Sequence, residues 1–175
     1  MELLEQMTQN NQIKKIDVVV TRLIDAPVAK VWKAWTDPEF VMMWWGPKDY
    51  ASTFCKIDLQ EGSKYVFGMT APKEQGGQES YTSGVYKKIV PGERLEFTQG
   101  LADKEGNRID PSKMNMPPDF PKEILTEVTF KEARCDMTDL TIVEHGWTPG
   151  QMYVYSLAGM QQSIDKLTEN LAKKR

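Results

Sequence analysis

The stretch GQMYVYSLAGMQQSIDKLTENLAK, residues 150–173, decides the fold. Its apolar side chains recur every three or four positions, which predicts a helix with one apolar stripe. The stripe consists of Tyr153, Leu157, Met160, Ile164, Leu167 and Leu171. A long helix of this kind is stable only when another element covers its stripe, so the preceding sequence must supply a partner surface.

Antiparallel strands are expected to supply that surface. Apolar and polar residues alternate in successive runs, which is the period of strands that bury one face. Turn signals such as Glu61-Gly62-Ser63 and Pro91-Gly92 separate neighbouring runs and predict a meander of hairpins. We expect the strands at residues 17–24, 51–60, 65–71, 81–90, 95–101, 124–130 and 138–144.

Two short helices are expected between the first two strands. The first begins near Pro27, because proline suits the first turn of a helix. Asp37 can cap a second helix that runs to Trp45, and Gly46-Pro47 ends it. The order of elements predicts an α+β fold, with a curved antiparallel sheet wrapped on the long C-terminal helix. We expect residues 1–15 to form a flexible N-terminal arm and residues 16–175 a single domain.

The composition excludes several classes of function. The 175 residues carry a formal net charge of −3, which argues against a nucleic-acid binder. No apolar run is long enough for membrane insertion, and the N-terminal residues lack the apolar region of a signal peptide. His145 is the single histidine and the two cysteines form no CxxC pair, so no zinc site or catalytic triad can be assembled. We therefore expect a cytoplasmic protein without metal or cofactor, and no feature indicates a protein partner or a homodimer.

Five short motifs stand out along the first hundred residues. They are Ala26-Pro27 through Trp32, Trp35-Thr36-Asp37-Pro38-Glu39, Trp44-Trp45-Gly46-Pro47, Gly84-Val85 and Pro91-Gly92-Glu93-Arg94-Leu95. Together they resemble the homologues of the heat-shock-protein-90 ATPase activator, in the START-like (SRPBCC) superfamily, over residues 16–172. The resemblance implies a helix-grip (START/Bet v-like) fold with a deep cavity between sheet and C-terminal helix. It also implies binding of lipids, polyketides or other apolar small molecules, as in most of the superfamily, of which a minority are cyclases or hydrolases.

The inward strand positions and the helix stripe form one candidate ligand site. Aromatic residues and methionine dominate this set, as is typical of apolar ligand pockets. The predicted ligand-binding residues are Trp45, Tyr65, Phe67, Met69, Tyr81, Phe97, Val128, Phe130, Tyr153, Leu157 and Met160. The same residues also describe a filled core, so the expected cavity rests mainly on the resemblance. We expect non-catalytic binding of an apolar or aromatic small molecule, lipid-like or polyketide-like.

Other interpretations stay open at this point. A cyclase- or hydrolase-type enzyme could use tyrosines and carboxylates of the same cavity. A co-chaperone-like ATPase activator is a third interpretation, which rests on the family name alone. His145 could carry a proton or be a structural histidine, and Trp44-Trp45 could plug the sheet or touch a ligand. The insert at residues 103–122 is either a solvated loop or a lid over the pocket.

Overall fold

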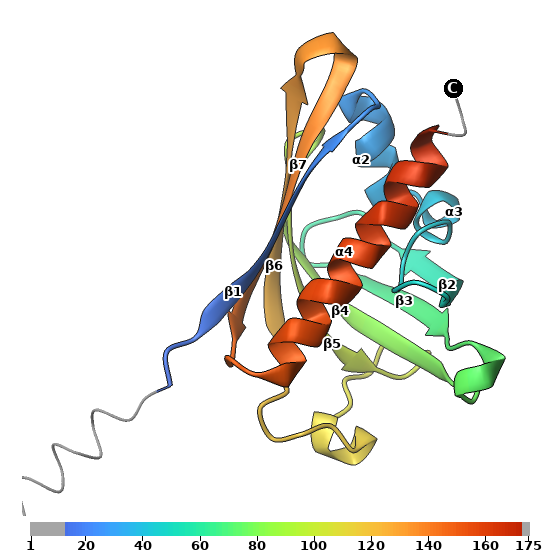
Figure 1. The fold of residues 1–175 in the computed structure, drawn as a ribbon, viewed down its shortest axis with the longest axis vertical. Helices are drawn as coiled ribbons and strands as arrows, with labels where there is room; N and C mark the ends of the chain where they lie inside the picture. The colour runs from blue at the N-terminus through green and yellow to red at the C-terminus, as the bar shows by residue number, and fades with distance from the viewer. Residues whose placement is uncertain (1–12, 173–175) are drawn as a thin grey trace, which may run out of the picture.

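The computed structural model describes residues 13–172 and places one long helix across one face of an antiparallel sheet (Figure 1). Within these residues seven strands follow the order β1-β7-β6-β5-β4-β3-β2. The strands are β1 (Ile16–Ile24), β2 (Ala51–Ile57), β3 (Lys64–Thr70), β4 (Glu79–Val90), β5 (Arg94–Ala102), β6 (Ile124–Ala133) and β7 (Met137–Trp147). The helices are α2 (Val28–Thr36), α3 (Pro38–Val41) and α4 (Gln151–Ala172). The expected α+β class and its long C-terminal helix are confirmed, while residues 1–12 of the expected N-terminal arm lie outside the described residues.

The two short helices form where the sequence predicts them. α2 buries Val31, Ala34 and Trp35 on one face. Asp37 caps α3, because its carboxylate accepts a hydrogen bond from the backbone N–H of Glu39 at 3.1 Å. α3 is shorter than expected and ends at its fourth residue, after which the chain turns. None of the helices in the described part of the chain is long and apolar enough to cross a membrane.

The segment after α3 is bound to both α2 and α4 by hydrogen bonds. Trp44 is fully buried, and its Nε1 donates a hydrogen bond to the backbone oxygen of Ala34 at 2.8 Å. From α4, Nζ of Lys166 donates to the backbone oxygens of Pro47 and Tyr50 at 3.3 and 3.1 Å. Trp44 therefore acts as a structural plug between α2 and the core, and Lys166 ties the following turn to the C-terminal helix.

A row of buried side chains crosses the inner face of the sheet, the face toward α4. Neighbouring strands bring its members opposite one another in the order Val18, Glu144, Thr126, Phe97 and Tyr86. Directly opposed residues of antiparallel strands have Cα atoms about 4.5–5.5 Å apart. An aromatic end of the row, on β4 and β5, therefore adjoins a polar middle on β6 and β7.

α4 is anchored mainly through its C-terminal half. Its buried residues all lie beyond Gly159; they are Met160, Ser163, Ile164, Leu167 and Leu171. Residues 151–159 are only partly buried or exposed. Arg22 of β1 adds an ion pair to Asp165 at 2.6 Å, again in the C-terminal half. Segments with few buried contacts open more readily, so the N-terminal half of α4 is the less tightly held cover of the sheet.

The insert at residues 103–122 is held by its own hydrogen bonds. The carboxylate of Asp103 accepts hydrogen bonds from two backbone N–H groups of its own turn, at 3.0 and 2.9 Å. Farther along, the ring of Phe120 packs edge-on against Trp147 of β7, with 5.9 Å between centroids. The insert lies at the end of the sheet where α4 begins (Figure 1). Its second half therefore covers the end of the inner face opposite to α2.

Candidate functional site

A cluster of aromatic rings fills the space under the middle of the sheet. Tyr65 stands at its centre, with ring centroids 4.7 Å from Phe67, 5.4 Å from Tyr86 and 5.5 Å from Phe97. The rings enclose a cavity of about 10 Å³, lined by Trp35, Tyr65, Phe67, Tyr86, Leu95 and Phe97. This is about the volume that one water molecule needs. A lipid-sized molecule would therefore enter only if the surrounding side chains moved.

The hydroxyl groups of this cluster are held neutral. Tyr65 donates a hydrogen bond to the backbone oxygen of Thr98 at 2.6 Å. Gly84 permits this close approach, because any Cβ there would overlap the Thr98 carbonyl. Burial raises the pKa of Tyr65 well above its ordinary value, and burial also raises the pKa of Tyr86. Both phenols therefore stay protonated at neutral pH and act as neutral members of the wall.

Glu144 is a buried carboxyl group two strands away from Phe97. It is 3% exposed, and its Oε2 accepts hydrogen bonds from Trp147 Nε1 and Ser156 Oγ, each at 3.0 Å. Burial raises its pKa, and hydrogen bonds from Ser156, Trp147 and Gln99 oppose that rise. The donors come from β7, β5 and the N-terminal half of α4, so the carboxyl group joins the sheet to the less tightly held part of the helix.

Two buried polar atoms beside these groups have no hydrogen-bond partner within the described residues. One is Nε1 of Trp35, a residue that lines the aromatic cavity. The other is Oγ1 of Thr126, which stands between Phe97 and Glu144 in the row across the sheet. Buried polar groups of folded proteins are nearly always paired, so such exceptions mark places where a small molecule or water can bind.

The predicted ligand-binding residues gather in one region, with one exception. Tyr65, Phe67 and Phe97 line the cavity. Met69 lies beside Gly46, at the turn after α3. The others belong to the surrounding core or pack against it: Trp45, Val128, Phe130, Tyr153, Leu157 and Met160.

The expected inward orientation of Tyr81 is wrong. Tyr81 lies opposite Gly68, whose neighbours along β3 point inward, and so it stands on the outer face. There its ring packs against Phe54, and its hydroxyl donates to Glu79 at 2.7 Å. Tyr86 belongs to the alternate set of residues on the same strand, and it faces inward and lines the cavity.

Sequence reasoning also missed the polar middle of the row. Glu144 continues the alternation of Leu140 and Ile142, both of which are buried. That alternation was a usable signal, because it assigns a carboxyl group to an inward position. Thr126 follows the same rule on β6, two residues before the buried Val128.

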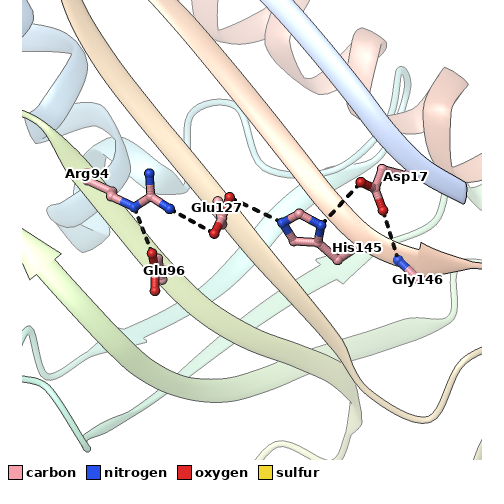
Figure 2. A network of polar contacts seen from close by, with 6 residues as sticks. All are labelled: Asp17, Arg94, Glu96, Glu127, His145 and Gly146. Carbon is pink, nitrogen blue, oxygen red and sulfur yellow. Dashed lines mark hydrogen bonds and ion pairs between the residues drawn. The ribbon is translucent and has the colours of Figure 1, made fainter.

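His145 belongs to a separate polar network on the outer face of the sheet. Figure 2 shows its imidazole between two carboxylates, with Nδ1 3.3 Å from Asp17 and Nε2 3.2 Å from Glu127. Glu127 also pairs with Arg94, at 2.8 Å, so the network spans β1, β7, β6 and β5. The histidine side chain is 37% exposed. Glu144 and His145 are adjacent on β7, so their side chains lie on opposite faces of the sheet. The network therefore joins strands on the outer, solvent-exposed face, away from the aromatic cavity. Among the described residues, no group of three or more metal-ligating side chains could hold a metal ion.

Solved structures of several bacterial proteins share the fold of this chain. Solved structures with the same fold include a protein from Chromobacterium violaceum, with a TM-score of 0.71 at 24% identity, covering 89% of this chain and 96% of that one. A protein from Arthrobacter aurescens gives a TM-score of 0.73 at 24% identity, with coverage of 94% and 90%. An AHSA1 protein from Silicibacter pomeroyi gives 0.72 at 18% identity, with coverage of 91% and 100%. At these identities the likeness shows the fold, and no curated protein matches the chain significantly.

The sequence profile of one family spans nearly the whole described chain. The family is described as activator of Hsp90 ATPase homolog 1-like protein, and its profile matches residues 25–172. This range includes α2, the aromatic cluster, the insert and α4. The chain therefore belongs to the AHSA1 family of the START-like (SRPBCC) superfamily.

Proposed function

We propose that this protein binds an apolar or aromatic small molecule, without catalysis, between the inner face of the sheet and α4. The observation that carries the proposal is the cavity enclosed by Tyr65, Phe67, Tyr86 and Phe97, which has aromatic walls. Trp35 also lines it, and the indole N–H of Trp35 has no hydrogen-bond partner among the described residues. Apolar walls with a few polar groups are the usual composition of small-molecule sites. Membership of the AHSA1 family supports a ligand-binding interior.

The titratable groups of the interior favour binding over catalysis. The pKa values of Tyr65, Tyr86 and Glu144 are all raised by burial. An acid–base mechanism normally uses two groups whose environments push their pKa values apart. The three groups described here are instead shifted in the same direction, toward their neutral forms. Such a wall suits an uncharged ligand.

Access to the interior runs under the N-terminal half of α4. A cavity of about 10 Å³ must expand before it holds a ligand. Residues 151–159 have no fully buried side chain, so moving them costs fewer apolar contacts than moving the C-terminal half. Gly159 lies where the two halves meet, and glycine is a weak helix former. A ligand is expected to displace this half of the helix and occupy the space that Leu157 partly fills.

The proposal is tested by titration with N-phenyl-1-naphthylamine, a neutral apolar dye that fluoresces when it leaves water. Wild type is expected to bind the dye. Leu157→Trp is expected to abolish binding, because the larger ring occupies the space under α4. Val154→Trp adds the same ring on the exposed side of the same helix, where Val154 is 56% exposed, and should bind like wild type.

Two results would contradict the proposal. One is the absence of dye binding by wild type together with no retained small molecule in native mass spectrometry of protein purified from its own host. The other is equal dye binding by Leu157→Trp and Val154→Trp, which would place the dye elsewhere. Circular dichroism of both variants shows whether each has kept its fold.

A further inference from the structure

The polar middle of the inner row lies within reach of a molecule held in the aromatic cavity. Phe97 lines that cavity, Thr126 is directly opposite Phe97 on β6, and Glu144 is directly opposite Thr126 on β7. The spacing of antiparallel strands puts the Glu144 backbone about 10 Å from that of Phe97. This is the span of a two-ring molecule. A ligand in the cavity that extends along the row therefore brings one end to Thr126 and Glu144.

The groups at that end have unused hydrogen-bonding capacity. Thr126 Oγ1 is buried and has no partner among the described residues. Its hydroxyl can donate one hydrogen bond and accept others. A carboxylate accepts about four hydrogen bonds, and Glu144 receives them from Trp147, Ser156 and Gln99, which are all uncharged donors. The site therefore has room for one more donor, with a hydroxyl beside it that can donate in return.

A hydroxyl group matches both requirements. It donates to the Glu144 carboxyl group and accepts from Thr126. A ligand carboxylate at the same place would bring a second acidic group against a buried one, with only uncharged donors around it. Burial disfavours the charged form of any acidic group, so a ligand carboxylate held there without a cationic partner would be strongly disfavoured.

We propose that the interior site selects apolar molecules whose polar end is an uncharged hydrogen-bond donor, such as a hydroxyl group, and rejects the corresponding carboxylates. This inference rests on the proposed function and adds to it the chemical class of the ligand. Neutral alcohols and phenols are its expected ligands, and fatty-acid-like anions are not.

The test uses three probes that share one ring system: 2-naphthol, naphthalene and 2-naphthoate, at pH 7. Wild type is expected to bind 2-naphthol at least about tenfold more tightly than 2-naphthoate, which is the factor for one hydrogen bond of about 1.4 kcal/mol. Naphthalene should fall between them. Thr126→Val removes the hydroxyl and keeps the shape, and it should reduce the preference for 2-naphthol over naphthalene. Glu144→Gln replaces the acidic group with a neutral amide that can donate a hydrogen bond, and it should raise the affinity for 2-naphthoate.

The matched control is Thr129→Val, on the same strand but on the outer face, where Thr129 lies opposite Thr141. It should leave all three affinities unchanged. Thr126→Val is expected to fold normally, because the hydroxyl that it removes has no hydrogen-bond partner among residues 13–172.

Each outcome bears on the inference. Equal affinity of wild type for 2-naphthol and 2-naphthoate would overturn it and leave the proposed function intact. An unchanged preference in both Thr126→Val and Glu144→Gln would also overturn it, because the hydroxyl would then lie elsewhere. Failure of all three probes to bind, while N-phenyl-1-naphthylamine still binds, would overturn the inference alone. Failure of that dye as well, with no retained small molecule, would overturn the proposed function. A preference for 2-naphthol that falls in both variants and survives in Thr129→Val would support the inference.

Discussion

Replacing Phe97 by alanine is the sharpest test of how the aromatic core is packed. Phe97 is 4% exposed, lines the cavity, and packs against Tyr65 and Tyr86 with centroids 5.5 and 6.2 Å apart. Phe→Ala changes in well-packed cores cost about 3–5 kcal/mol, through lost transfer free energy and the cavity left behind. For a chain of this size, that loss lowers Tm by roughly 6–20 °C. The removed ring should open an enclosed space on the order of 100 Å³, approaching the size of engineered cavities that bind benzene.

The assay is urea unfolding of wild type and Phe97→Ala, with and without benzene. Benzene at a hundred times its Kd should restore about 2.7 kcal/mol to the variant, because it binds the folded form alone. Phe54→Ala is the control. Phe54 packs on Tyr81 at the outer face, so its removal opens no enclosed space and benzene should restore nothing. A loss below about 1 kcal/mol in Phe97→Ala, or no recovery with benzene, would refute the picture of a closed aromatic interior.

Three further predictions concern other parts of the molecule. Leu171→Ala, at the buried C-terminal end of α4, should cost about 2–5 kcal/mol in urea unfolding and leave dye binding unchanged. Glu144→Gln should gain stability relative to wild type as pH rises, because burial raises the pKa of Glu144 in the folded state. As pH rises from the ordinary pKa of about 4.3 to the raised one, the free energy of unfolding of wild type falls by about 1.4 kcal/mol per unit of pKa shift. Unfolding at successive pH values would show this fall. A pH-independent difference in stability between wild type and Glu144→Gln would contradict it. Lys166→Met should cost about 1–3 kcal/mol, measured the same way, because two backbone oxygens of the turn after α3 lose their donor.

Periodicity predicted the scaffold well because burial imposes it. The α4 stripe requires contacts every three or four residues, and the C-terminal members, from Met160 to Leu171, are buried as expected. The N-terminal members, Tyr153 and Leu157, are only partly buried. Their spacing is equally regular. However, the burial of the N-terminal half of α4 depends on the insert and on the end of the sheet, and the spacing of apolar residues within the helix contains no information about either.

The candidate site was predicted less completely, for three physical reasons. Alternate residues of β4 face opposite sides of the sheet, and Tyr86 rather than Tyr81 faces inward. Because both alternating sets of β4 contain a tyrosine, residue type alone does not tell which set faces inward. A pattern of apolar residues also cannot identify an inward carboxyl group such as Glu144, although the alternation along β7 places it. Cavity volume depends on how rings interlock, so sequence alone could not distinguish a space of about 10 Å³ from a deep pocket.

The pairing of β1 with β7 has a consequence for the order in which the chain can fold during synthesis. A hydrogen bond from the backbone N–H of Gly146 to the Asp17 carboxylate joins residues 129 positions apart, and β1 pairs with this late strand at Ile16 and from Val18 to Ile24. At about 5–20 residues per second, a ribosome needs roughly 6–26 s to supply β7 after β1. During that interval the apolar side of β1, with Val18 and Val20, has no sheet to join. Strands β2 to β5 pair with sequence neighbours and can form hairpins meanwhile, so β1 is the strand whose exposure a nascent-chain chaperone would have to cover.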